Sequence, residues 1–179
     1  MNRRAYLSTF TGIIISGCLG NPSKQNTLYE NTLKTLNENQ LGEGYNTLGD
    51  EKRHWPMAYA LIASAEANRY SKSNAVDAAE NASTAVNWLY EHRNRDEEGE
   101  VGWGLPIAWD AFSDGSTNPQ HHKYTITTAL AGHALLDVIE CMPSLEPRIR
   151  KDYLNAVQDA VNPYLDRSLY NEYKYGICF

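Results

Sequence analysis

The stretch from Thr125 to Glu140 reads TITTALAGHALLDVIE and is apolar on nearly every face of a helix. The stretch from Pro56 to Tyr70, PMAYALIASAEANRY, has the same character until Glu66, and its proline suits the first turn of a helix. A helix that is apolar all round is expected to be buried on every side. Small residues recur in both stretches and would let neighbouring helices approach closely. The two segments therefore predict the inner helices of a layered, all-α fold.

Three further segments carry apolar residues on one stripe only, which is typical of a helix with a solvent-exposed face. They are Thr27 to Gln40, Asn74 to His92 and Arg148 to Leu169, and Pro163 is expected to bend or shorten the last. Striped and apolar helices alternate along the chain, and no stretch predicts a convincing strand. The alternation predicts an array of αα-hairpins in which outer helices cover inner ones. A simple four-helix bundle would show a stripe on every helix instead.

A faint internal repeat accompanies this alternation. Each striped helix is followed by a loop with glycine and aromatic residues: Gly42 to Tyr45, Gly99 to Gly104 and Tyr173 to Gly176. An inner helix follows each of the first two loops, whereas the sequence ends three residues after the third. We expect an interrupted array, because a closed ring would need several more hairpins. The alternative is that the apolar end of the chain packs into the core.

The first residues resemble an export signal. Arg3 and Arg4, followed by an aromatic residue and a leucine, match a twin-arginine sequence, and the stretch after them is too short to span a bilayer. The residues Ile15-Ser16-Gly17-Cys18 resemble a lipobox, which is cleaved just before a lipid-modified cysteine. The alternative is a buried N-terminal helix with a chance cysteine. We therefore expect three parts: a signal peptide (1–17), a polar tether that begins with the lipidated Cys18 (18–26) and a helical domain (27–179).

Composition limits the class of protein. The chain has 179 residues, of which 42% are hydrophobic, and this is enough for one domain with its own core. A formal net charge of −6 argues against nucleic acid as a partner, because nucleic-acid binding needs a basic face. An anchor on Cys18 predicts a protein at the cell surface, on the outer face of the cytoplasmic membrane. In that compartment Cys141 and Cys178 could pair, with two buried thiols as the favoured alternative.

The loop from Gly102 to Pro119 has the composition of a ligand site. Two tryptophans, Trp103 and Trp109, lie close in sequence to Asp110 and Asp114. Aromatic faces stack on the C–H face of a sugar ring, and a few polar groups on an aromatic floor are typical of a small-molecule pocket. If the segment after Trp109 forms a helical turn, the two carboxylates fall four residues apart on one face. They could then act as general acid and base, as in glycosidases.

Structural roles are the alternative for the same four residues. Trp103 and Trp109 could fill the core of the fold. Asp110 could cap a helix, and Asp114 begins an Asp-Gly-Ser sequence that is common in turns.

The same loop offers weak matches to metal sites. The spacing of Asp110, Asp114, Ser116 and Asn118 lacks the full pattern of a calcium loop. The adjacent His121 and His122 cannot both reach one metal ion from an extended chain. We therefore predict neither a metal nor a cofactor. His133, in an apolar helix, is expected in the core, or facing a central cavity if the array forms a ring.

The residues GWGLP (102–106), AWDAF (108–112) and YTITTALAG (124–132) resemble the (α/α) toroid superfamily, as does the alternation of helices. This superfamily includes six-hairpin glycosidases, polysaccharide lyases and the C-terminal domain of glucuronyl epimerases. The resemblance spans residues 41–179, and its motif-level part spans residues 102–132. It implies a partial (α/α) toroid that takes a polysaccharide or oligosaccharide at the mouth of the ring. In lyases and epimerases of this group a tyrosine donates or accepts a proton.

By position, the resemblance implies two sets of site residues. The catalytic candidates are Asp110, Asp114 and Tyr124. The substrate-binding candidates are Trp103, Trp109 and His121.

Three functions fit these observations, and each is an expectation. The first is a surface-tethered protein that acts on, or binds, extracellular polysaccharide. The second is a non-catalytic glycan- or protein-binding lipoprotein. The third is an inactive fragment of a longer toroid enzyme, because the hairpins are too few to close a ring.

Overall fold

The computed structural model describes residues 30–32, 34, 41–45, 51–95, 99–110, 113–165, 171–173 and 176–178, the last two ranges by their backbone. The chain divides into two compact units, Met1–Glu38 and Asn39–Phe179. The expected signal peptide, the tether and Cys18 lie outside the described residues. Of the expected helix Thr27 to Gln40, residues 30–32 and 34 are described, and they are helical. The following paragraphs concern the second unit.

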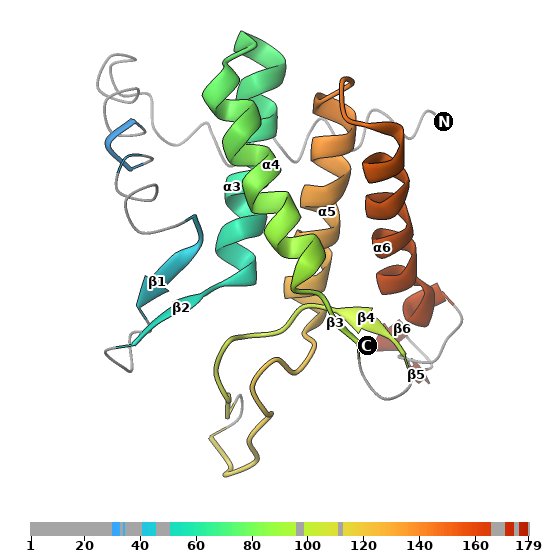
Figure 1. Ribbon diagram of the computed structural model, residues 1–179. Coiled ribbons are helices and arrows are strands. Elements are labelled where there is room, and N and C mark those ends of the chain that lie inside the picture. Colours follow the sequence, from blue (N-terminus) through green and yellow to red (C-terminus); the bar gives the residue numbers. More distant parts are fainter. Residues whose placement is uncertain are drawn as a thin grey trace. The chain divides into compact units, whose positions relative to one another are not determined.

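The described residues of the second unit form four helices: α3 (Pro56–Ser73), α4 (Val76–Glu91), α5 (Thr125–Cys141) and α6 (Pro147–Leu165). They confirm four of the expected helices and a mainly helical fold. Figure 1 shows that successive helices run in opposite directions, so α3 and α5 begin at the same end. The helix α3 packs against both α4 and α5, and α6 packs against α5. The two apolar helices therefore form a central pair, and each is flanked by the helix that follows it in the chain.

Local sequence explains the ends of α3. Pro56 occupies the first turn, where its missing N–H is not needed. Asn74 ends the helix with a left-handed backbone (φ 52°), and its N–H donates to the carbonyl of Tyr70. Among the described residues, no helix combines the length and the apolar character that crossing a membrane requires.

Short β-hairpins accompany the helices, although no stretch of the sequence predicted a convincing strand. The antiparallel pairs are β1 (Glu43–Tyr45) with β2 (Lys52–His54), β3 (Asn94–Arg95) with β4 (Val101–Gly102), and β5 (Asn171–Tyr173) with β6 (Gly176–Cys178). Each pair falls at one of the three glycine- and aromatic-bearing loops of the sequence repeat. In Figure 1 the pairs β1–β2 and β3–β4 lie at the end where α3 and α5 begin. Strands of two or three residues are too short to show the alternation that identifies a strand.

The composition of the two central helices predicted that they are buried on every side, and this prediction was wrong. Leu61 on α3 is 59% exposed, and Ile126 and Leu136 on α5 are 61% and 42% exposed. The buried faces carry small residues, which let the two helices approach closely; they include Ala60, Ala63, Ala67, Ala131 and Ala134. The two helices are therefore packed against their neighbours on their small-residue faces. Each also has a face with apolar side chains exposed to solvent, here called its open face.

His133 lies on the open face of α5 and not in the core, so that expectation was wrong. Its side chain is 63% exposed, and its Nδ1 lies 3.0 Å from the carboxylate of Asp137, one turn along the helix. Cys141, at the end of the same helix, is a free thiol and half-buried. The side chain of Cys178 lies outside the described residues.

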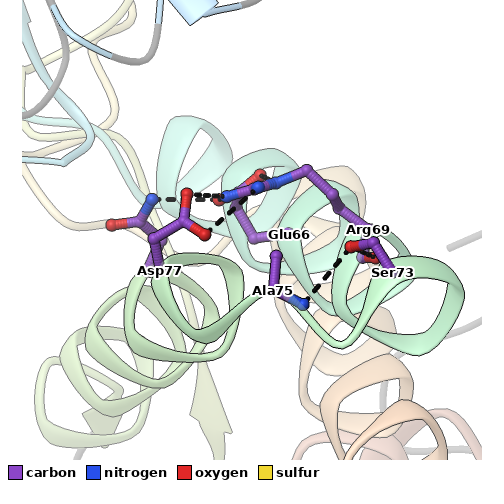
Figure 2. A network of polar contacts seen from close by, with 6 residues as sticks. Glu66, Arg69, Ser73, Ala75 and Asp77 are labelled. Carbon is purple, nitrogen blue, oxygen red and sulfur yellow. Dashed lines mark hydrogen bonds and ion pairs between the residues drawn. The ribbon is translucent and has the colours of Figure 1, made fainter.

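A buried carboxylate joins α3 to α4 near their connection (Figure 2). Glu66 is fully buried and accepts hydrogen bonds from Arg69 (2.8 and 3.0 Å) and from the amide of Asn81 on α4 (2.9 Å). Arg69 also reaches Asp77 on α4, with 2.6 Å between Nη2 and Oδ2. A buried charge is tolerated only when it is paired and hydrogen-bonded, and Glu66 meets both conditions.

Candidate functional site

Trp103 is a core residue. Its side chain is fully buried, and its Nε1 donates to the carbonyl of Leu89 at 2.9 Å. Its backbone N–H donates to the hydroxyl of Thr128, and its carbonyl accepts from the N–H of Tyr124. These bonds connect the end of α4 with the start of α5. The expectation that Trp103 stacks on a sugar was therefore wrong, because neither face of the ring is accessible.

The described residues after Trp109, namely Asp110 and residues 113–118, are not helical, and the expected helical turn is not seen in them. Trp109, which is 40% exposed, pairs with Asn118 through two backbone hydrogen bonds of 3.0 and 2.9 Å. Within this turn Asp110 accepts from the N–H of Gly115 (3.1 Å), and Asp114 accepts from the N–H of Ser116 (2.8 Å). Both carboxylates thus stabilise the turn.

The electrostatics of Asp114 also oppose the role of a general acid. The hydroxyl of Ser116, and then its backbone N–H, hold the pKa of Asp114 below its usual value. A general acid at neutral pH needs the opposite shift, which burial produces. Asp114 is exposed.

Tyr124 and His121 lie at opposite ends of a short segment and have different neighbours. The hydroxyl of Tyr124 accepts a hydrogen bond from the amide of Asn118 at 3.2 Å. The carbonyl of His121 accepts from the amide of Asn94, which follows α4, at 2.9 Å. His121 has a left-handed backbone (φ 64°), and its N–H donates to the carbonyl of Leu105. The hydrogen bond from Asn94 holds the backbone of His121 beside the end of α4.

Two glycines let this segment approach Trp103. A Cβ on Gly104 would lie 2.1 Å from the carbonyl oxygen of His122, and a Cβ on Gly102 would lie 2.8 Å from Cδ of Lys123. Gly104 also pairs with Lys123 in an antiparallel bridge. In the Gly-Trp-Gly sequence, the tryptophan therefore anchors the loop in the core. The two glycines occupy positions where a Cβ would overlap neighbouring atoms.

A cleft of about 520 Å³, here called the main cleft, lies between β2, the end of α4 and the loop that precedes α5. Its volume is in the range of small-molecule sites. Of the six predicted catalytic and substrate-binding residues, His121 alone lines it. The lining residues are Lys52, Arg53, His54, Pro56, Trp88, Glu91, His92, Arg93, Asn94, Pro106, Gln120 and His121.

A column of stacked rings leads from the core to the main cleft. Tyr59 stacks on Trp88 with ring centroids 3.9 Å apart, and His92 also stacks on Trp88, with centroids 4.2 Å apart. Nδ1 of His92 lies 2.9 Å from the carbonyl oxygen of Trp88, and a carbonyl can only accept. Nδ1 of His92 must therefore carry a proton. The exposed ring of His92 ends the column at the cleft.

A second histidine of the cleft is held by the same tyrosine. Nδ1 of His54 lies 2.8 Å from the hydroxyl of Tyr59. Burial, helped by the negative charge of Glu43, raises the pKa of Tyr59 to about 12, so the phenol keeps its proton. The hydroxyl of Tyr59 and Nδ1 of His54 share one hydrogen bond, in which either group can donate, and this bond fixes the orientation of the His54 ring. Gly42 makes room for this arrangement, because a Cβ there would lie 2.3 Å from the ring of Tyr59.

A second cleft of about 610 Å³ adjoins the main cleft. It shares Arg93, Asn94 and His121 with the main cleft and adds Arg95, His122 and Lys123. Within the part of the chain that the structure describes, no group of three or more His, Cys, Asp or Glu residues could hold a metal ion.

Three short stretches of the sequence mark the main cleft, although none of them alone predicts a site. Three short basic runs, each with histidine, occur in an otherwise acidic chain: Lys52-Arg53-His54, His92-Arg93-Asn94-Arg95 and His121-His122-Lys123. The fold brings all three to the two adjoining clefts. None of the runs is distinctive alone, so their convergence is the informative feature.

Comparisons of the chain with models of protein families, with curated proteins and with solved structures gave no match. The ground for a function is therefore the chemistry of the main cleft.

Proposed function

We propose that the protein is exported, is anchored through a lipid on Cys18 and binds extracellular polysaccharide in the main cleft. The observation that carries the binding proposal is the main cleft itself, with an aromatic column that ends at His92 and a His54 ring held in place by Tyr59. Sugars present apolar C–H faces and a dense set of hydroxyls. An exposed ring next to oriented polar groups suits both features.

The hydrogen-bonding groups around the ring are oriented before any ligand arrives. Tyr59 orients His54, and the carbonyl of Trp88 orients His92. The amide nitrogen of Gln120, another lining residue, donates to the carbonyl of Pro106 at 3.1 Å. Groups that are already held in place lose little conformational entropy when a ligand binds.

The proposal is binding and not hydrolysis. Hydrolysis of a glycosidic bond commonly uses two carboxyl groups. Among the described residues, Glu91 is the one carboxylate that lines the main cleft. Asp110 and Asp114 stabilise a turn, and neither lines this cleft.

We also propose that the second unit is part of an (α/α) toroid array. The repeat of one β-hairpin and two antiparallel helices supports this proposal, as does the central pairing of α3 with α5. The main cleft then lies at the end where the inner helices begin, where loops would form the mouth of a ring.

The binding proposal is tested with the full chain carrying Cys18→Ser, which removes the lipid, against a panel of soluble polysaccharides by calorimetry. We expect at least one polysaccharide to bind, and His92→Ala to weaken it roughly tenfold, or about 1.4 kcal/mol. Trp109→Ala is the matched control, because Trp109 is an exposed aromatic residue outside the main cleft. Loss of binding in Trp109→Ala but not in His92→Ala would move the site to the 109–118 turn. Absence of binding to every polysaccharide would refute the proposal.

The anchor is tested in a host that has the twin-arginine pathway. The chain with its native Cys18 should partition into detergent with the membrane fraction. The variant Cys18→Ser should be released from the membrane, because the lipid on Cys18 is the attachment. Cys141→Ser is the control and should stay with the membrane. A Cys18→Ser chain that remains in the membrane fraction would show that the attachment is not a lipid on this residue.

A further inference from the structure

The two clefts concentrate positive charge on an acidic chain. Five cationic side chains line them: Lys52, Arg53, Arg93, Arg95 and Lys123. Four of the five histidines of the chain line them as well. Among the described residues, Glu91 is the one acidic side chain in this lining, although the chain as a whole has a net charge of −6.

The contacts of two arginines leave their charge available to a ligand. Arg93 lies over the ring of Tyr90, 4.0 Å from its centroid, and donates to the carbonyl of the same residue. Both groups are neutral, so they orient the guanidinium without cancelling its charge. Arg53 donates to the carbonyl of Pro106 at 2.9 Å and pairs with the exposed Glu51 at 2.6 Å. Water screens an exposed pair of this kind.

The other three cations have acidic partners. Lys52 in the main cleft lies 3.7 Å from Glu43, and in the second cleft Lys123 lies 3.0 Å from Glu100 and Arg95 lies 3.2 Å from Asp159. The side chains of Arg95 and Asp159 are about half exposed, so this pair contributes little energy and can exchange its partner for a ligand anion. The second cleft is therefore cationic, and Arg95 is the cation there that can meet a ligand anion.

The two clefts adjoin at Arg93, Asn94 and His121, which line both. The hydrogen bond from the amide of Asn94 to the carbonyl of His121 holds the two walls of this junction together. Each cleft has the volume of a complete small-molecule site. A ligand that uses both must therefore be extended and must carry its charges along its length.

We infer that the two clefts form one cationic track for an extended anionic polysaccharide, with carboxylate or sulfate groups that meet Arg53, Arg93 and Arg95. This inference rests on the proposed function and adds the charge and the length of the ligand. Guanidinium groups favour it, because they bind carboxylate and sulfate with two parallel hydrogen bonds.

The test uses the full chain with Cys18→Ser and three probes: polygalacturonate with carboxylates, dextran sulfate with sulfates, and neutral dextran. An anionic probe should bind at least about tenfold more tightly than dextran, a difference of roughly 1.4 kcal/mol. Its affinity should fall when salt rises from about 0.05 to 0.5 M, because salt screens exposed charges. The better of the two anionic probes identifies the anionic group.

Variants locate the track. Arg93→Gln should weaken binding of the anionic polymer several-fold, whereas Arg93→Lys should retain part of it, since it keeps the charge and loses the planar fork. Arg95→Gln, in the second cleft, should weaken the polymer but not digalacturonate, which fits within the main cleft. Lys151→Gln is the control for loss of one positive charge, because Lys151 is exposed on α6 and lines neither cleft.

The outcomes separate the inference from the function on which it rests. Equal binding of dextran and both anionic polymers, with no effect of salt, would overturn the anionic track while leaving polysaccharide binding in place. Failure of all polysaccharides would refute the proposed function itself. Tighter binding of single-stranded DNA than of either anionic polysaccharide would overturn the inference in favour of a nucleic-acid ligand.

Discussion

The hydroxyl of Tyr59 lies 2.8 Å from Nδ1 of His54, so a buried residue of α3 orients the ring of a cleft histidine. The pKa of Tyr59, raised to about 12 by burial and by Glu43, keeps the phenol protonated and neutral at physiological pH. The stacked rings of Tyr59, Trp88 and His92 extend the influence of the same residue to the second histidine. Tyr59 is therefore a positioning residue for the main cleft.

Tyr59→Phe should release the ring of His54. Nitrogen NMR should show a shifted Nδ1 signal of His54 in the variant, because the hydrogen bond between Nδ1 and the phenol is lost. Unfolding free energy should fall by only about 0.5 to 1.5 kcal/mol, the usual value of one hydrogen bond.

The control for this variant is Tyr153→Phe. Tyr153 is equally buried, burial raises its pKa to about 12, and its hydroxyl bonds to Asn87 and not to His54. The His54 signals should stay unchanged in Tyr153→Phe. Unchanged signals in Tyr59→Phe as well would contradict the positioning role.

Trp103→Ala should cost about 3 to 5 kcal/mol of unfolding free energy, because it empties a fully buried site and removes the bond to Leu89. Trp109→Ala should cost less than about 1 kcal/mol, since that ring is 40% exposed. Urea unfolding measures both values. Similar losses in the two variants would contradict the core position of Trp103.

Gly104→Ala should destabilise the chain by about 1 to 3 kcal/mol, because the new methyl group would overlap the carbonyl of His122. It should also shift the NMR signals of His121 and His122, which the segment carries into the clefts. Gly115→Ala is the control: its backbone has φ +87° but a Cβ there has nothing within 4 Å. That variant should cost about 1 to 2 kcal/mol from backbone strain and leave the histidine signals in place.

The pair of Arg69 and Asp77 (Figure 2) predicts a dependence of stability on pH. The hydrogen bond from Arg69 lowers the pKa of Asp77 below its usual value in the folded chain. A lowered folded pKa means that the contribution of Asp77 is complete above the unfolded pKa, near 3.9, and is lost as the pH falls through the folded pKa. Asp77→Asn should therefore flatten the unfolding free energy between about pH 5 and 2.

Glu80→Gln is the matched control for this pH experiment, because Glu80 is an exposed acidic residue of the same helix α4. Denaturant unfolding at a series of pH values measures the slope. An equal change of slope in Asp77→Asn and Glu80→Gln would show that the pair with Arg69 is not the cause.

The helices could be predicted from the sequence because their signal is local. The apolar and striped periodicities of α3, α4, α5 and α6 repeat within each segment, and a helix forms from contacts three and four residues apart. The three hairpins could not be predicted, because strands of two or three residues hold no readable alternation. The repeat of glycine and aromatic residues marked their places without revealing their structure.

The same division applies to the candidate site. Composition identified the 102–119 loop as unusual, but burial decided that Trp103 anchors the core, and backbone hydrogen bonds decided that Asp110 and Asp114 stabilise a turn. The sequence by itself determined four helices, their order and an acidic chain with three short basic runs that contain histidine. Only the tertiary structure brought those runs together, because the main cleft depends on contacts between segments that are far apart in sequence, such as that of Trp103 with Leu89 and Asn94 with His121.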